Sequence, residues 1–286
     1  MTPHIHDETK IGQVTLKVSS LARSLRFYRE VIGFQVLREE NSTAELTVDG
    51  IHPLVLLEEV TDAMIPERRT VAGLYHFAIL LPNRKSLGLS LRQLIASGIH
   101  IGHSDHLVSE ALYISDPDHN GIEIYADRPR DTWKRDENGE YIMTLDPIDW
   151  DGLLEEAKDE VWKGLPIGTT IGHIHLHVSD LAKTKEFYTG VLGFEQTAHM
   201  SDSALFVSAG GYHHHIGLNT WAGIGAKMPP PRSTGLDYFT IVVPNEPQLH
   251  AVYTRLQEAQ HPVSQEEETL FFNDPSGISI RVQVAK

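Results

Sequence analysis

The sequence predicts an α+β protein built from four copies of one unit, each a strand, a helix and further strands. Two observations support this prediction: segments recur at a half-chain offset, and each begins with apolar alternation that gives way to helical spacing. The recurring pairs are IGQVTLKVSSLARSLRFYREVIGF (11–34) with IGHIHLHVSDLAKTKEFYTGVLGF (171–194), GLYHFAILLPN (73–83) with GLDYFTIVVPN (235–245), and DPDHNGIEIYA (116–126) with DPSGISIRV (274–282). The chain is therefore a duplication in which each half holds two units.

The first unit begins with a strand over 13–18, where apolar and polar residues alternate. A helix follows, because apolar side chains recur on one helical face and a glycine ends the run. These residues are Leu21, Leu25, Tyr28, Ile32 and Gly33. The segments AELTVDG and HPLVLLEE then predict two strands joined through Asp49-Gly50, a favourable turn dipeptide.

The second unit repeats this order. The patterns predict a strand over 75–81, a helix over about 86–97 ended by Gly98, and strands over 111–115 and 122–126 joined by a turn at 116–121.

Between the halves, residues 128–168 form a polar, turn-rich connector. Its segment DWDGLLEEAKDEVW predicts a short amphipathic helix with Trp150, Leu154, Ala157 and Val161 on its apolar face. We therefore expect one domain over 10–127, the connector over 128–168, and a second domain over 169–284.

The third unit opens on GHIHLHVSDL, which places His173, His175 and His177 on one face of a predicted strand. Such a face either meets water or carries a ring that binds something. The choice depends on whether other units supply partners.

Composition excludes several classes of function. The net charge of −15 argues against nucleic acid or an anionic membrane as a partner. The chain has no cysteine, which excludes disulfides, thiolate metal sites and cysteine nucleophiles. The first residues lack a signal-peptide pattern, and no apolar run is long enough to span a membrane. We expect a cytoplasmic, soluble protein, and the sequence leaves open whether it forms a homo-oligomer.

Four βαβββ modules, with FY…LGF closing the first helix and DPDxxGIEIY before a last strand, resemble the vicinal oxygen chelate superfamily. This superfamily includes glyoxalase I, the fosfomycin- and bleomycin-resistance proteins and the type I extradiol ring-cleaving dioxygenases. The likeness covers about 10–127 and 170–284. It implies the two-domain fold of that superfamily.

The resemblance implies metal ligands in two columns of the repeat. The first-strand column holds Gln13, His76, His173 and Tyr238, and the last-strand column holds Glu123 and Ser279. His76, His173 and Glu123 are the ligands we expect. This set requires units two and three to pair across the connector. If units one and two pair instead, Gln13 becomes the third ligand.

Two histidines and a carboxylate form the arrangement typical of non-haem Fe(II) oxygenases. Mn(II) suits the same ligands, and Zn(II) or Ni(II) would suit a glyoxalase-like enzyme. Taken singly, His76 is more often a satisfied core histidine and Glu123 a solvent-facing strand residue. Their positions in aligned columns favour the metal site.

Two further segments resemble extradiol dioxygenases. GGYHHHIGLN (210–219) is interpreted as a strand, and His214 stands four residues before Leu218, as the acid–base histidine does in those enzymes. We expect His213 and His215 to face the opposite way, and we expect His175 and His177 to lie behind the metal ligands or to face solvent. The alternative for His214 is that it belongs to a polyhistidine patch with no catalytic function.

In HLVSEALY (106–113), Tyr113 stands ten residues before Glu123, as in the homoprotocatechuate type. His106 lies two residues closer to Tyr113 than that pattern requires. The resemblance implies that both hydrogen-bond the substrate oxygen or its dioxygen adduct. A tyrosine that only packs against the barrel is the alternative for Tyr113.

Together, the segments IGHIHLHVSDL, GGYHHHIGLN and YADRP resemble the catechol 2,3-dioxygenases of bacilli. This resemblance implies extradiol cleavage of a catechol by O₂ at an Fe(II) centre. The alternatives are a glyoxalase-like metal-dependent lyase or isomerase, a hydroquinone-cleaving dioxygenase, and a non-catalytic small-molecule binding protein. Segment 223–235 is Gly- and Pro-rich and either covers the site or only links units three and four.

Overall fold

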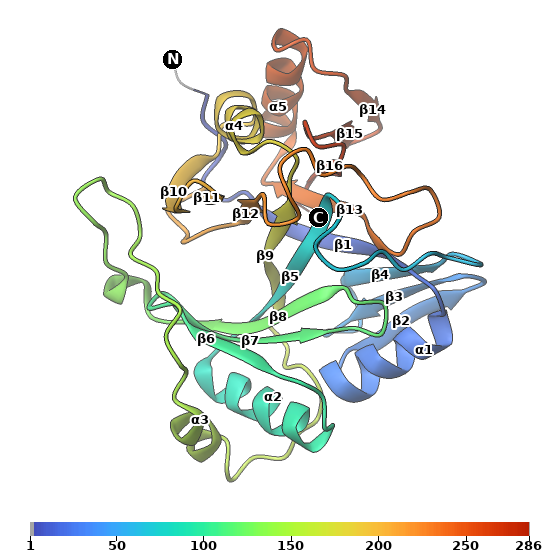
Figure 1. Ribbon diagram of the computed structural model, residues 1–286, viewed down its shortest axis with the longest axis vertical. Coiled ribbons are helices and arrows are strands. Elements are labelled where there is room, and N and C mark those ends of the chain that lie inside the picture. Colours follow the sequence, from blue (N-terminus) through green and yellow to red (C-terminus); the bar gives the residue numbers. More distant parts are fainter. Residues whose placement is uncertain (1–2, 286) are drawn as a thin grey trace.

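A computed structural model describes residues 3–285 and contains four βαβββ units, which confirms the predicted α+β fold (Figure 1). Each unit has a leading strand, a helix and three further strands. Unit one comprises β1 (Lys10–Val18), α1 (Leu21–Arg26) with η1 (Phe27–Ile32), β2 (Gln35–Glu40), β3 (Thr43–Thr47) and β4 (Pro53–Glu59). Unit two comprises β5 (Gly73–Leu81), α2 (Arg84–Ala96), β6 (Gly102–Asp105), β7 (Ser109–Ser115) and β8 (Gly121–Asp127).

The second half repeats the order. Unit three comprises β9 (Thr170–His177), α4 (Leu181–Lys185) with η3 (Glu186–Val191), β10 (Glu195–Met200), β11 (Ala204–Ser208) and β12 (Ile216–Asn219). Unit four comprises β13 (Gly235–Val243), α5 (Glu246–Glu258), β14 (Ser264–Glu266), β15 (Thr269–Asn273) and β16 (Ser279–Val284). The connector holds η2 (Arg130–Thr132) and α3 (Trp150–Glu156).

The strands form two eight-stranded sheets, and each sheet takes one unit from each half of the chain. One has the order β14-β15-β16-β13-β1-β4-β3-β2, and the other β10-β11-β12-β9-β5-β8-β7-β6. Unit one therefore shares a sheet with unit four, and unit two with unit three. In both sheets the two leading strands pair antiparallel at the centre. This is the pairing that the ligand set His76, His173 and Glu123 requires.

The division of the chain into domains over 10–127 and 169–284 stays a prediction. It follows the order of the units along the sequence, whereas each sheet draws on both ranges.

The first helix of unit one widens into a π-helix over its second half, which apolar spacing alone does not predict. It ends where Gly33 adopts a φ of 100°, as expected for a left-handed helix stop. The wider turn accompanies a buried Tyr28, whose hydroxyl donates to Asp116 Oδ2 at 3.1 Å. The same π turn and the same kind of tyrosine–aspartate bond recur in unit three, between Tyr188 and Asp274.

The connector helix is shorter than predicted. It ends at Glu156, and Val161, assigned to the apolar face, is 74% exposed. Ala157 is fully buried as predicted, and Leu153 is fully buried beside it, because α3 packs against α2 along that face (Figure 1). The contact is close: a Cβ on Gly88 of α2 would lie 2.1 Å from the Leu153 carbonyl oxygen.

The strand predicted over 210–219 is also too long. Only Ile216–Asn219 is strand, and residues before it form a turn in which Gly210 and Gly211 have φ values of 58° and 62°. Glycine takes such values readily, so the pair reverses the chain here. His214 therefore lies in a loop, and the prediction that His213 points away from it is wrong.

Among residues 3–285, every helix is too short or too polar to cross a bilayer.

Candidate metal centre

His76, Glu123 and His173 come together in the sheet formed by units two and three. His76 Nε2 lies 3.0 Å from Glu123 Oε2, and His173 Nε2 lies 3.1 Å from the same oxygen. One ligand atom of each residue lies within 4.8 Å of the others. All three side chains are at most 7% exposed. The cluster is thus a buried set of nitrogen and oxygen donors that converge on one point.

The register of three strands explains the convergence. In the centre, Ala78 of β5 pairs with Glu123 of the parallel strand β8 and with His173 of the antiparallel strand β9. His76 lies two residues before Ala78 and therefore on the same face. Ala78 is fully buried and small, so it leaves the space into which the carboxylate and imidazoles project. The strand register thus places the side chains of His76, Glu123 and His173 around Ala78.

Electrostatics favour the protonation state that a metal needs. Burial alone would raise the pKa of Glu123, but the attraction of His173 and His76 outweighs it and holds this pKa well below its usual range. Burial lowers the pKa of His173 to about 4. At neutral pH the site therefore holds a carboxylate and a neutral His173. Metal binding requires deprotonated ligands of this kind.

The protein alone does not satisfy this cluster. His76 Nε2 is buried without a hydrogen-bond partner of proper geometry among residues 3–285. An orphaned buried nitrogen is rare in native proteins, and an ion at the point of convergence would satisfy it. The donor set, two imidazoles and one carboxylate without thiolate, suits a divalent transition metal. The residues present thus fit a metal.

Tyr113 and His106 form a pair beside the cluster. Tyr113 of β7 pairs with Glu123 across the sheet, and its ring centroid lies 5.6 Å from that of His76. The His106 Nδ1–H donates to the Thr144 carbonyl at 2.7 Å, so Nε2 is free to accept from the Tyr113 hydroxyl, also at 2.7 Å. Burial and the nearby Glu123 raise the pKa of Tyr113 well above its usual value. Tyr113 is therefore a neutral hydrogen-bond donor.

His214 approaches from the loop before β12. Its ring centroid lies 4.1 Å from that of His173 and 4.9 Å from that of Phe206. Burial and the neighbouring histidines lower the pKa of His214 well below its usual value. A neutral imidazole thus lies against one member of the cluster.

The remaining histidines of β9 are buried, and neither faces solvent. His177 Nδ1 donates to Asn219 Oδ1 at 2.6 Å. The ring centroid of His175 lies 5.1 Å from that of His76, and a Cβ on Gly217 would come within 2.8 Å of the His175 ring. The ring of His175 therefore packs against the cluster at His76, whereas His177 packs against Tyr75 and lines the cavity described below.

Sequence reasoning missed Asp127 and His213, which lie behind His214. His213 Nε2 is 3.0 Å from Asp127 Oδ1, and His213 Nδ1 is 2.8 Å from His214 Nδ1. Asp127 closes β8 and His213 precedes β12. No spacing within one segment connects residues so far apart in the chain.

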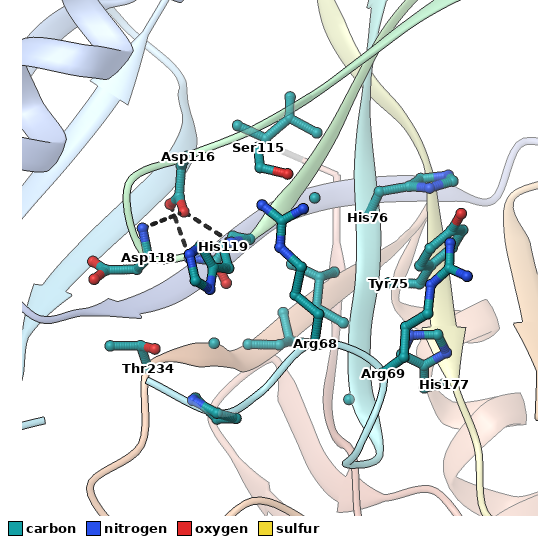
Figure 2. Close-up of a pocket in the computed structure, with 18 of the residues that line it drawn as sticks. Arg68, Arg69, Tyr75, His76, Ser115, Asp116, Asp118, His119, His177 and Thr234 are labelled. Atoms are coloured by element: carbon teal, nitrogen blue, oxygen red, sulfur yellow. Dashed lines mark hydrogen bonds between the residues drawn. The ribbon is translucent and has the colours of Figure 1, made fainter. Parts of the chain in front are cut away.

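A cavity of about 560 Å³ reaches the cluster from the junction of the two sheets. Figure 2 shows Tyr75, His76 and His177 along one side, the Asp116 turn with Asp118 and His119 on the other, and Arg68 between them. Tyr113 also lines this space, whereas Glu123 and His173 are not among its lining residues. The cavity therefore touches the cluster at His76.

The segment 223–235 covers this cavity as well as linking units three and four. Met228 and Thr234 line the cavity. The segment is held to the linker between units one and two by backbone bonds: Thr234 N to the Met64 carbonyl at 2.9 Å and Ala72 N to the Lys227 carbonyl at 2.8 Å. The two linkers together form its rim.

Comparison with known proteins relates this architecture to one superfamily. Residues 10–124 and 170–282 match the family model of the Glyoxalase/Bleomycin resistance protein/Dioxygenase superfamily. The chain is 56% identical over 272 residues to catechol-2,3-dioxygenase of Bacillus subtilis (strain 168), a match that covers 95% of each protein. It is 30% identical over 120 residues to biphenyl-2,3-diol 1,2-dioxygenase 3 of Rhodococcus globerulus, which covers 41% of this chain and 63% of that one.

Among solved structures, glyoxalase I from Zea mays is similar with a TM-score of 0.57 at 15% identity, covering 97% of this chain and 92% of that one. A likeness at this identity concerns the fold alone.

Proposed function

Because the chain belongs to the Glyoxalase/Bleomycin resistance protein/Dioxygenase superfamily, we propose that it is an extradiol dioxygenase that cleaves a catechol-type ring with O₂. The observation that carries this proposal is the buried cluster of His76, Glu123 and His173 in a chain 56% identical to a catechol-2,3-dioxygenase. The ion we assign to the cluster is Fe(II), since two histidines and one carboxylate are typical of non-haem Fe(II) oxygenases. Mn(II) suits the same donors.

When bound, the ion would polarise the ring hydroxyls and supply the redox chemistry that reaction with O₂ requires. Glu123, His76 and His173 would hold it, and all three side chains are buried. The carboxylate of Glu123 is already ionised at neutral pH, because the two imidazoles stabilise its charge. The protein therefore presents a preorganised site.

Tyr113 and His106 act on the substrate oxygen. The Tyr113 hydroxyl is a donor with a raised pKa, and it lines the cavity that leads to His76. When a catechol enters, this hydroxyl exchanges its bond to His106 Nε2 for one to the ionised ring oxygen, and a charge-assisted bond of this kind is roughly twice as strong as a neutral one. His106, held by its bond to the Thr144 carbonyl, keeps the tyrosine in position before the substrate binds.

His214 moves the proton. It is neutral because its pKa is lowered, so it can accept a proton as the substrate loses its second one, and return it to the product. Its contact with the ring of His173 places it beside the cluster. Cleavage next to the pair of hydroxyls then yields a semialdehyde that contains both oxygen atoms of O₂.

The test is a spectrophotometric assay of protein loaded anaerobically with Fe(II), then mixed with catechol in aerated buffer. We expect a yellow ring-fission product from the wild-type protein and none from Glu123→Gln. A product absorbing as expected for cleavage between the hydroxyls, or no product with bound iron, contradicts the proposal. Hydroquinones and then 2-oxoaldehyde–thiol adducts, the substrates of the alternative functions, would be assayed next. Protein that binds catechol but no metal would support the binding protein.

A further inference from the structure

A chain of hydrogen bonds runs behind His214 to the carboxyl end of β8. Asp127 Oδ1 lies 3.0 Å from His213 Nε2, and His213 Nδ1 lies 2.8 Å from His214 Nδ1. The side chain of His213 is fully buried, whereas that of Asp127 is 24% exposed. The line thus connects the metal cluster, through His214, to a carboxylate in contact with solvent.

The carboxylate at the end of this line determines where the protons lie. A carboxylate only accepts, so His213 donates from Nε2, and a ring with a single hydrogen there leaves Nδ1 as an acceptor. His214 must then donate from Nδ1, and its own Nε2 is left without a hydrogen. No residue among 3–285 hydrogen-bonds that Nε2, so it is free to take a proton.

We propose that Asp127 and His213 are positioning residues that hold His214 as the Nδ1–H tautomer and thereby make its Nε2 the base of the reaction. This inference rests on the proposed function. When Nε2 accepts a proton from the substrate, the Nδ1–H of His214 stays hydrogen-bonded to His213. The positive charge on His214 then faces the dipole of the His213 ring, which its bond to Asp127 holds in place. No proton needs to move along the line from His214 to Asp127.

A neighbouring tyrosine, Tyr212, provides a matched control. The Tyr212 hydroxyl donates to the same oxygen of Asp127 at 3.1 Å, and it also shares a bond of 2.7 Å with the Tyr125 hydroxyl. Tyr212 touches the carboxylate but lies outside the line from Asp127 to His214. If Asp127 only supported packing, loss of its bond to Tyr212 and loss of its bond to His213 would affect activity equally. If Asp127 selects the histidine tautomer, only loss of its bond to His213 should affect activity.

The experiment compares Asp127→Asn with Tyr212→Phe in Fe(II)-loaded protein, with iron content and melting temperature measured for each. The asparagine amide donates to His213 Nε2, which reverses both histidine tautomers. We expect kcat to fall by at least ~10-fold in Asp127→Asn with KM within about 3-fold of wild type, since general acid–base catalysis contributes roughly 10²–10⁴-fold. Tyr212→Phe should keep kcat within about 3-fold, and Asp127→Glu should recover part of the loss. Equal effects of Asp127→Asn and Tyr212→Phe overturn the proposal.

A second measurement needs no variant of Asp127. In ¹⁵N-histidine-labelled wild-type protein loaded with diamagnetic Zn²⁺, long-range ¹H–¹⁵N spectra distinguish the two tautomers, and His214→Asn identifies the signal. We expect His214 to carry its hydrogen on Nδ1; a hydrogen on Nε2 overturns the inference even if Asp127→Asn does not fold. The two proposals fail separately: a wild-type protein inactive with catechols contradicts the dioxygenase, whereas an active Asp127→Asn contradicts only the tautomer assignment.

Discussion

His173 and Glu123 lie opposite the same residue, Ala78, on the two sides of β5, and 3.1 Å separates His173 Nε2 from Glu123 Oε2. His173 belongs to the third unit and Glu123 to the second, so the cluster exists only because these units share a sheet. If the cluster of His76, Glu123 and His173 holds the catalytic metal, substitutions in it or at Ala78 should remove metal and activity together. Equivalent changes in the other sheet leave both intact.

Glu123→Gln should lower metal affinity by at least ~10-fold, because it removes the one charged donor of the site. The amide also leaves His76 and His173 without a carboxylate partner. Iron per chain after dialysis measures the effect. The matched control is Glu45→Gln, which breaks an exposed pair with Arg38 in the other sheet. Full iron content in Glu123→Gln would show that this carboxylate is not a ligand.

Ala78→Val should empty the metal site while the protein remains folded. The added methyl groups enter the space between Glu123 and His173, and overpacking of a core costs roughly 1–3 kcal/mol. Ala44→Val is the control, since Ala44 is equally buried in the sheet of units one and four. We expect similar urea midpoints for the two variants but low iron content only in Ala78→Val. Normal iron content in both variants would contradict a metal site beside Ala78, between Glu123 and His173.

Tyr113→Phe should lower kcat/KM for catechol by about 10–100-fold with unchanged iron content. The variant loses one hydrogen bond to a charged group, worth roughly 1.5–3 kcal/mol, and keeps the buried ring. Steady-state oxygen consumption measures the loss. An unchanged kcat/KM would leave Tyr113 with the packing role that was its alternative.

His215 should make the metal-free protein less stable in acid. Burial, followed by the charges of His213 and His173, lowers its pKa to about 3, and its Nδ1 accepts bonds from Ser208 Oγ at 2.9 Å and the Ala209 N–H at 3.2 Å. The folded state holds the ring neutral, whereas the unfolded chain takes up a proton below its ordinary pKa of about 6.5. The stabilisation is therefore complete above pH 6.5 and is lost as pH falls toward 3.

The loss attributable to this ring between pH 7 and pH 5 is about 2 kcal/mol. Urea unfolding at the two pH values, in wild type and His215→Gln, measures it as a difference of differences. The variant should show the smaller fall in unfolding free energy. Equal falls would mean that His215 does not contribute to the pH dependence.

The repeat made most of the fold predictable, as well as the cluster of His76, Glu123 and His173. Each unit carries the same alternation and the same helix, so aligned columns placed His76 and His173 at equivalent positions of two leading strands. The expected ligand set required units two and three to pair, but pairing of units one and two stayed open, because β-strand alternation specifies the buried face of a strand and not its neighbour. The sheet order resolves this in favour of units two and three.

The errors come from competing patterns within one segment. In GGYHHHIGLN the run before Ile216 resembles a strand, but two glycines with positive φ turn the chain, and this turn brings His213 against His214. Asp127 was not predicted because its role depends on a histidine 86 residues away. Location in the cytoplasm, association into homo-oligomers and the two-domain division stay predictions.

The most direct test is oxygen uptake on an electrode after anaerobic loading with Fe(II) and addition of catechol. A catechol dioxygenase with its iron on His76, Glu123 and His173 should consume about one O₂ per catechol and form a yellow product, and Glu123→Gln should do neither. Iron-loaded wild-type protein that takes up no oxygen with catechol or its simple substituted relatives would contradict this function.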